Sequence, residues 1–116
     1  MARLSTHEDD CASILGRRFT NVHLWLDEFA AILPPDRFGE MHRKYRHRDS
    51  VIHDQFVGYA LQAAKLHLIR DYDRYSYHNF DTMREDQIDS AYADVVPFLE
   101  LSRRDSILKG DSSSTF

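Results

Sequence analysis

The sequence has little of what cross-links, interrupts or anchors a chain. Cys11 is the single cysteine among 116 residues, so no disulfide can form within the chain and a thiolate-rich zinc knuckle is excluded. This cysteine usage favours a reducing, cytoplasmic setting. The chain has only four glycines and three prolines, of which Pro34 and Pro35 are adjacent. So few turn-forming residues favour helices over many short strands.

Long apolar runs and an excess of positive charge are also missing. No apolar stretch approaches the roughly 20 residues of a membrane span. The N-terminal segment becomes acidic at Glu8, Asp9 and Asp10, where a secretory signal needs an apolar region. We therefore expect a soluble, cytoplasmic protein without a membrane partner. The net charge of -4 argues against a general binder of polyanions, although a local basic patch remains compatible with it.

The length fits one compact unit. A folded chain of this size buries about two thirds of its surface, enough for one small core. Hydrophobic residues make up 42% of the chain and charged residues 29%, as in ordinary globular proteins. The composition therefore predicts a single domain over residues 1–110. The serine-rich end, residues 111–116, is typical of a flexible tail.

Helical periodicity runs through most of the chain and predicts an all-α bundle of four to five helices. No βαβ alternation, repeat or strand pair is recognisable. The strongest signal lies between Val51 and Asp71, where apolar residues recur at helical spacing without a proline. We expect the helices to run from a capping box at Ser5 to Gly16, from a cap at Thr20 to Pro34, from Asp36 towards Arg48, from Val51 to Asp71, and from a cap at Asp81 to Pro97.

Histidine is the most informative residue type. Of seven histidines, His23 and His67 each precede an aspartate by four residues, Asp27 and Asp71. Side chains four apart on a helix are neighbours, so each pair can direct an imidazole and a carboxylate at one point. The helical phase turns His67 and Asp71 inward. A random order of this composition gives about one such pair, so their number alone establishes no site.

The other histidines are placed less favourably. His42 and His47 are five residues apart, about 140° on an ideal helix, and can bind one ion together only if the helix breaks between them. His53 and Asp54 form a dipeptide superficially like that of the helical HD phosphohydrolases, but without the apolar helix that normally leads into it. His7 and His78 fall in terminal and loop segments, so we expect them to be solvated.

Three segments in a fixed order resemble a family of small uncharacterised bacterial and phage proteins. They are Val22-His23-x-Trp25-Leu26-Asp27, then His42-Arg43-x-x-x-His47, then a helix that ends in His67-x-Ile69-x-Asp71. The family carries a VHxW(F/L)D segment, an HRxxxHH segment and a later histidine followed by acidic residues. Arg48 stands where the family has the second of its paired histidines. The resemblance covers residues 20–72 and implies that His23, His42, His47 and His67 form one cluster.

These observations favour a metal site inside the bundle. Mixed nitrogen and oxygen donors suit Zn, Fe, Mn or Ni, and an open coordination position would polarise a water for hydrolysis of a phosphate or acyl group. The alternative is structural: the histidines cap helices, bond to backbone carbonyls or pair with aspartates. The candidate ligands are His23, His42, His47 and His67, with Asp27 or Asp71 as a ligand or as an orienting carboxylate.

A second hypothesis is a binding module without catalysis. Five cations lie within twelve residues and could contact the phosphates of a nucleic acid or an acidic protein partner. A charged run of this kind is equally typical of a solvated helix face. Self-association into a homo-oligomer through Trp25 and the tyrosines is a further alternative. The basic residues are Arg37, Arg43, Lys44, Arg46 and Arg48.

Overall fold

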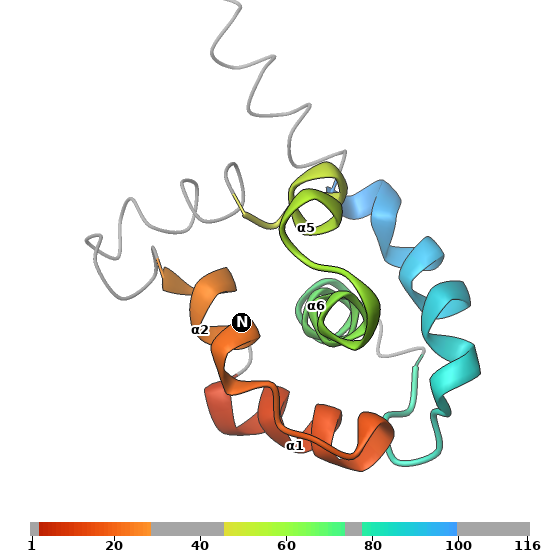
Figure 1. Cartoon of the computed structure of the whole chain (residues 1–116). Coiled ribbons are helices and arrows are strands. Elements are labelled where there is room, and N and C mark those ends of the chain that lie inside the picture. The colour runs from red at the N-terminus through yellow and green to blue at the C-terminus, as the bar shows by residue number, and fades with distance from the viewer. Residues whose placement is uncertain (1–2, 29–45, 74–77, 100–116) are drawn as a thin grey trace, which may run out of the picture.

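The protein is an all-α single domain, as the sequence predicts, in the computed structural model shown in Figure 1. The structure describes residues 3–28, 46–73 and 78–99, and no strand occurs in these three ranges. Its elements are α1 (Leu4–Leu15), α2 (Thr20–Leu26), α5 (Asp49–Gln55), α6 (Gly58–Tyr72), the short 3-10 helix η1 (Glu85–Gln87) and a helix over residues 88–99.

Helix α6 occupies the centre of the domain. Figure 1 looks along its axis, and α1, α2 and α5 each pack directly against it. Four consecutive α6 residues from Leu66 to Ile69 are fully buried, which requires neighbours on every side of the helix. Any polar side chain in this stretch therefore lies in the core, where it needs a partner.

The helix over residues 88–99 covers another side of α6 (Figure 1). The amino group of Lys65 on α6 lies 2.9 Å from a carboxylate oxygen of Asp89, and the Tyr92 hydroxyl donates to Asp49 Oδ1 at 2.8 Å. The predicted cap of this helix at Asp81 is wrong, because Asp81 lies in a turn and the helical residues begin only with η1 at Glu85. The helix continues past Pro97 to residue 99. Its buried apolar residues join the common core: Ile88, Ala91, Tyr92, Val95 and Leu99.

The predicted start signals of the first two helices are wrong, although the helices themselves are present. The predicted end of the second helix at Pro34 is wrong as well, because the backbone leaves the helical conformation at Asp27 and α2 ends at Leu26. Helix α1 begins at Leu4 after an extended Arg3, and no side chain caps it, so Ser5 is not a capping residue. Helix α2 follows Phe19, which has a left-handed φ of 53°. Its Thr20 hydroxyl instead donates to the Glu8 carboxylate and ties α2 to α1. The stop at Gly16 is confirmed, with φ at 84°.

The expected continuous helix from Val51 to Asp71 is also wrong, because it is broken into α5 and α6. Phe56 and Val57 are extended, and Gly58 begins α6 with φ at 59°. Glycine adopts this left-handed conformation without the steric penalty of a Cβ, and the β-branched Val57 tolerates an extended backbone. The break allows α5 to fold back and pack on α6.

Two further predictions concern residues that the structure does not describe. The helix expected to start at Asp36 falls mostly within residues 29–45. The tail expected at residues 111–116 also lies outside the described ranges. Among the described helices, none combines the length and the apolar character needed to cross a bilayer.

The sign of the stability change on substituting Gly58 distinguishes a helix broken before α6 from a continuous one. We expect Gly58→Ala to lower the free energy of unfolding by about 1 kcal/mol, because alanine is strained at positive φ. In a continuous helix the same change would raise stability by about 1 kcal/mol, since alanine is the better helix former. Urea unfolding of both proteins measures the difference, and a stabilised variant would contradict the break.

Candidate metal centre

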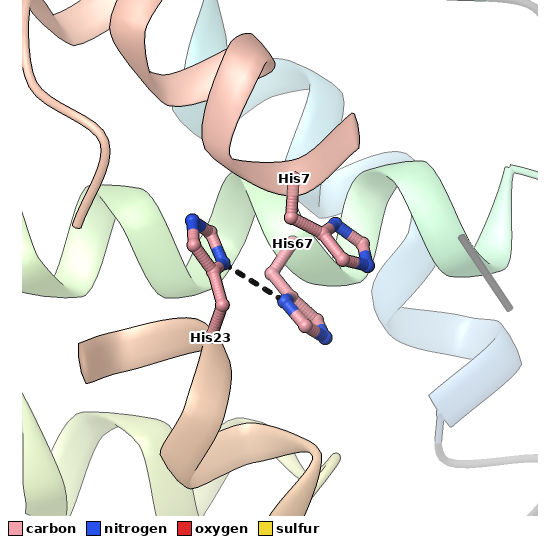
Figure 2. A group of neighbouring side chains, drawn as sticks. All are labelled: His7, His23 and His67. Atoms are coloured by element: carbon pink, nitrogen blue, oxygen red, sulfur yellow. Dashed lines mark hydrogen bonds between the residues drawn. The ribbon is translucent and has the colours of Figure 1, made fainter. Parts of the chain in front are cut away.

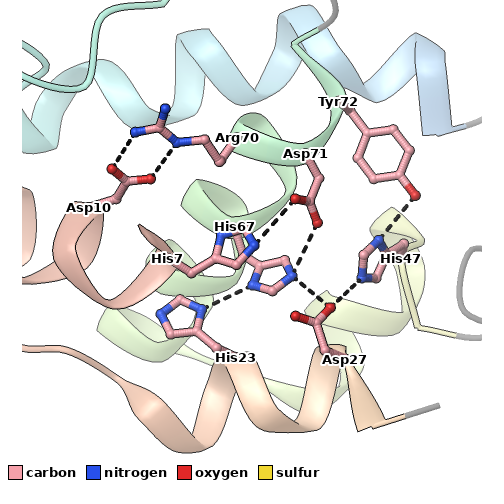
Figure 3. A network of polar contacts seen from close by, with 9 residues as sticks. All are labelled: His7, Asp10, His23, Asp27, His47, His67, Arg70, Asp71 and Tyr72. Atoms are coloured by element: carbon pink, nitrogen blue, oxygen red, sulfur yellow. Dashed lines mark hydrogen bonds and ion pairs between the residues drawn. The ribbon is translucent and has the colours of Figure 1, made fainter. Parts of the chain in front are cut away.

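His67 lies at the centre of a buried polar network (Figure 3). Its side chain is fully buried on α6, yet both ring nitrogens have polar neighbours. Nδ1 is 3.0 Å from His23 Nδ1, while Nε2 is 3.2 Å from Asp27 Oδ1 and 3.3 Å from Asp71 Oδ2. One imidazole thus joins a histidine on one edge to two carboxylates on the other.

Helix α2 holds the His67 ring at both ends. His23 faces Nδ1 and Asp27, which caps the C-terminus of α2, faces Nε2. These two residues are separated by about one helical turn, or roughly 5.4 Å along the axis, which suits the width of an imidazole with its two contacts. The packing of α2 on α6 therefore brings the two His-x3-Asp pairs together at one ring.

His47, in the turn before α5, extends the network beyond Asp27. Its Nε2 lies 3.6 Å from Asp27 Oδ1, and its Nδ1 lies 3.0 Å from the Tyr72 hydroxyl. The His47 ring stands at 84° to the ring of His67. Together with Asp71, these residues form a group in which each member offers one ligand atom and all four atoms lie within 4.8 Å of one another: Asp27, His47, His67 and Asp71.

His7 was expected to be solvated, and that prediction is wrong. The residue is buried on α1, where its ring stacks on His67 with centroids 3.6 Å apart (Figure 2). Its Nε2 lies 3.3 Å from Asp71 Oδ1. The capping-box interpretation hid a helical signal, because His7 lies four and seven residues before Cys11 and Ile14, on the face that α1 turns to the core.

The three stacked histidines make a poorer ion site than the group of Asp27, His47, His67 and Asp71. His7, His23 and His67 also offer ligand atoms within 4.8 Å of one another. The rings of His7 and His67, however, are inclined by only 14° and lie face to face. An imidazole lone pair points along the ring plane, so an ion bound by one of these rings in its plane would sit over the face of the other.

The contacts fix which nitrogens carry hydrogens. The Arg18 carbonyl lies 3.0 Å from His23 Nε2 and can only accept, so that nitrogen donates. Burial, together with repulsion by His67 and His7, lowers the pKa of His23 to about 4. A neutral His23 then leaves Nδ1 as an acceptor, and His67 Nδ1 must donate to it.

The carboxylates stabilise a charged His67 when no ion is bound. Burial by itself would lower the pKa of His67, but hydrogen bonds to Asp27 and Asp71 outweigh it and raise the pKa to about 9. Burial would likewise raise the pKa of Asp71, yet its bonds to His67 and His7 hold that pKa far below the usual range. Asp71 is thus held as a carboxylate beside the charged imidazole.

The remaining sequence candidates lie elsewhere. His42 belongs to residues 29–45, which the structure does not describe. His53 is exposed and pairs with Asp49 at 3.1 Å, away from the cluster. His78 was expected to be solvated, but its side chain is only 19% exposed and Nε2 lies 3.2 Å from Asp94.

The predicted basic face is described only in part. The Arg46 guanidinium donates to the Trp25 carbonyl, pairs with Glu28 and lies 4.1 Å above the indole centroid. The Arg46 side chain therefore packs on the C-terminal end of α2 and pairs with a carboxylate there. Arg48 is partly buried, while Arg37, Arg43 and Lys44 fall outside the described residues, so a nucleic-acid or protein partner stays a prediction.

Cys11 takes no part in the network. It is fully buried, and burial together with the Asp10 charge raises the pKa of its thiol to about 12. A neutral, enclosed thiol is not a nucleophile.

No protein-family model, curated protein or solved structure matches the chain. The resemblance to small bacterial and phage proteins therefore stays a prediction.

The network predicts a stability maximum near pH 6.5 for the metal-free protein. The folded pKa of His67, about 9, exceeds its ordinary 6.5, so its stabilisation is complete below pH 6.5 and is lost as the pH rises to 9. The folded pKa of His23, about 4, is depressed, so stability falls as the pH drops from 6.5 to 4. Each effect is on the order of 3 kcal/mol at most.

Thermal unfolding in EDTA between pH 4 and 9 measures both limbs. His67→Gln should abolish the alkaline limb, whereas His53→Gln, at an exposed histidine, should keep both limbs. A melting temperature of the wild-type protein that stays constant or rises from pH 6.5 to 9 would contradict the charged His67.

Proposed function

We propose that the protein binds one divalent transition-metal ion through Asp27, His47, His67 and Asp71. One observation carries this proposal: ligand atoms from three separate segments converge within 4.8 Å in the core (Figure 3). The segments are the C-terminus of α2, the turn before α5 and the last two turns of α6. The stacked His7 and the bonded His23 then act as supports of this site.

The spacing of the four atoms suits an ion at their centre. Ligands about 2.0–2.2 Å from one ion lie about 3.0 Å apart along the edges of an octahedron and about 3.4 Å apart along those of a tetrahedron. The observed separations from His67 Nε2 are 3.2 Å to Asp27 and 3.3 Å to Asp71, and Asp27 is 3.6 Å from His47 Nε2. The other separations among the four atoms do not exceed 4.8 Å, so a closer approach of the side chains would bring all four into coordination.

Charge balance supports the same conclusion. Without an ion, the carboxylates of Asp27 and Asp71 share the Nε2–H of a protonated His67, whose single positive charge balances only one of their two negative charges. A divalent cation would compensate both charges and would take the place of the proton on Nε2. Buried charges are retained where they are paired or bind a metal.

The donor set indicates the class of ion and of chemistry. Two imidazoles and two carboxylates suit Zn, Fe, Mn or Ni. Asp27 is the most exposed of the four side chains, at 20%, compared with 5% or less for the others. An ion with more than four ligands could bind water on the Asp27 side, and such a water is activated for attack on a phosphate or acyl centre. Hydrolysis is accordingly the reaction class that we propose.

Elemental analysis of protein purified without a histidine tag tests the proposed site. We expect about one transition-metal ion per chain, lost in the double variant His47→Ala, Asp27→Asn, which removes two ligands from different segments. His53→Ala, outside the network, is the matched control and should keep the ion. Wild-type protein that stays metal-free after incubation with Zn, Mn, Fe and Ni salts would refute the proposed function.

The proposed reaction class has a separate test. Metal-loaded protein should hydrolyse a simple activated phosphodiester or ester, and the rate should fall to background in EDTA and in the double variant. Activity that survives EDTA would locate the chemistry elsewhere. A metal-loaded but inactive protein would confine the proposal to binding.

A further inference from the structure

We propose that His23 is a positioning residue that selects the ring orientation of His67 and so directs Nε2 towards the ion. This inference rests on the proposed metal site. It concerns a side chain that the sequence suggested as a ligand and that the contacts place on the opposite edge of the His67 ring (Figure 2).

A chain of hydrogen bonds determines the role of each nitrogen. The Arg18 carbonyl accepts from His23 Nε2, which leaves His23 Nδ1 as an acceptor 3.0 Å from His67 Nδ1. The hydrogen between them therefore belongs to His67. With Nδ1 of His67 protonated, Nε2 is the nitrogen whose lone pair is available to an ion, and it is the one that faces Asp27 and Asp71.

Packing alone does not determine which of two orientations the His67 ring adopts. An imidazole rotated by 180° about its bond to Cβ occupies nearly the same volume, with carbon atoms where the nitrogens were. The stacked ring of His7, 3.6 Å away, contacts either orientation through the ring face. A hydrogen bond distinguishes them, because only Nδ1–H can donate to His23. Metal-binding histidines generally need such a partner on their second nitrogen.

Two substitutions at His23 separate hydrogen bonding from volume. The amide oxygen of asparagine reaches the position of Nδ1, so His23→Asn should keep an acceptor for His67. His23→Leu fills the space without an acceptor. We expect the leucine variant to bind zinc 10- to 100-fold more weakly than wild type, the usual loss for such partners, and the asparagine variant to recover most of that loss.

Leu26→Ala serves as a matched control for stability. Leu26 is fully buried on the same helix, so its truncation should destabilise the fold without removing a contact of the His67 nitrogens. Zinc affinity of this folded variant, measured by competition with a chelating dye, should stay within a few-fold of wild type. If its affinity falls as far as that of His23→Leu, the effect is one of stability and the inference is overturned.

Nitrogen-15 NMR of the zinc-loaded wild-type protein tests the orientation without any variant. We expect His67 to bind through Nε2 with a hydrogen on Nδ1, and His23 to carry its hydrogen on Nε2. Zinc bound through His67 Nδ1, or equal zinc affinity in the wild type and His23→Leu, would overturn the role of His23 while leaving the metal site intact. A wild-type protein that binds no zinc, manganese, iron or nickel would remove the proposed site itself.

Discussion

The burial of the His67 imidazole between carboxylates is the interaction on which the rest of the structure depends. A polar ring within the fully buried stretch of α6 from Leu66 to Ile69 is costly unless each nitrogen has a partner. His23 supplies a partner on one edge, and Asp27 with Asp71 supplies partners on the other. The elements that bring these residues to α6 are the ones that build the core, so the fold and the polar network form together.

This arrangement ties three distant parts of the chain to one point. His7 arrives on α1, His23 and Asp27 on α2, and His47 from the turn before α5. Outside the network, the Arg70 guanidinium pairs with both carboxylate oxygens of Asp10 and fastens α1 to α6. Because the ligand atoms come from separate segments, an ion bound to them would bind the folded state selectively and stabilise it by mass action.

Local spacing predicted part of this site, and tertiary contacts decided the rest. In each of the pairs His23–Asp27 and His67–Asp71 the two residues are four apart, so the sequence could predict that each pair shares one helix face. Their meeting at a single ring could not, because it depends on how α2 crosses α6. His7 escaped prediction because a capping pattern at Ser5 competed with the helical phase. The periodicity predicts a continuous helix because apolar residues recur on both sides of Val57, and Gly58 is the only local sign of the break.

The central claim is that an ion lies among Asp27, His47, His67 and Asp71. Anomalous diffraction from crystals grown with zinc tests it most directly, since the zinc edge locates the ion independently of the protein atoms. The account predicts one peak about 2.0–2.2 Å from His47 Nε2, His67 Nε2 and oxygens of both aspartates. A peak among His7, His23 and His67 instead, or no zinc peak within the bundle, would contradict it.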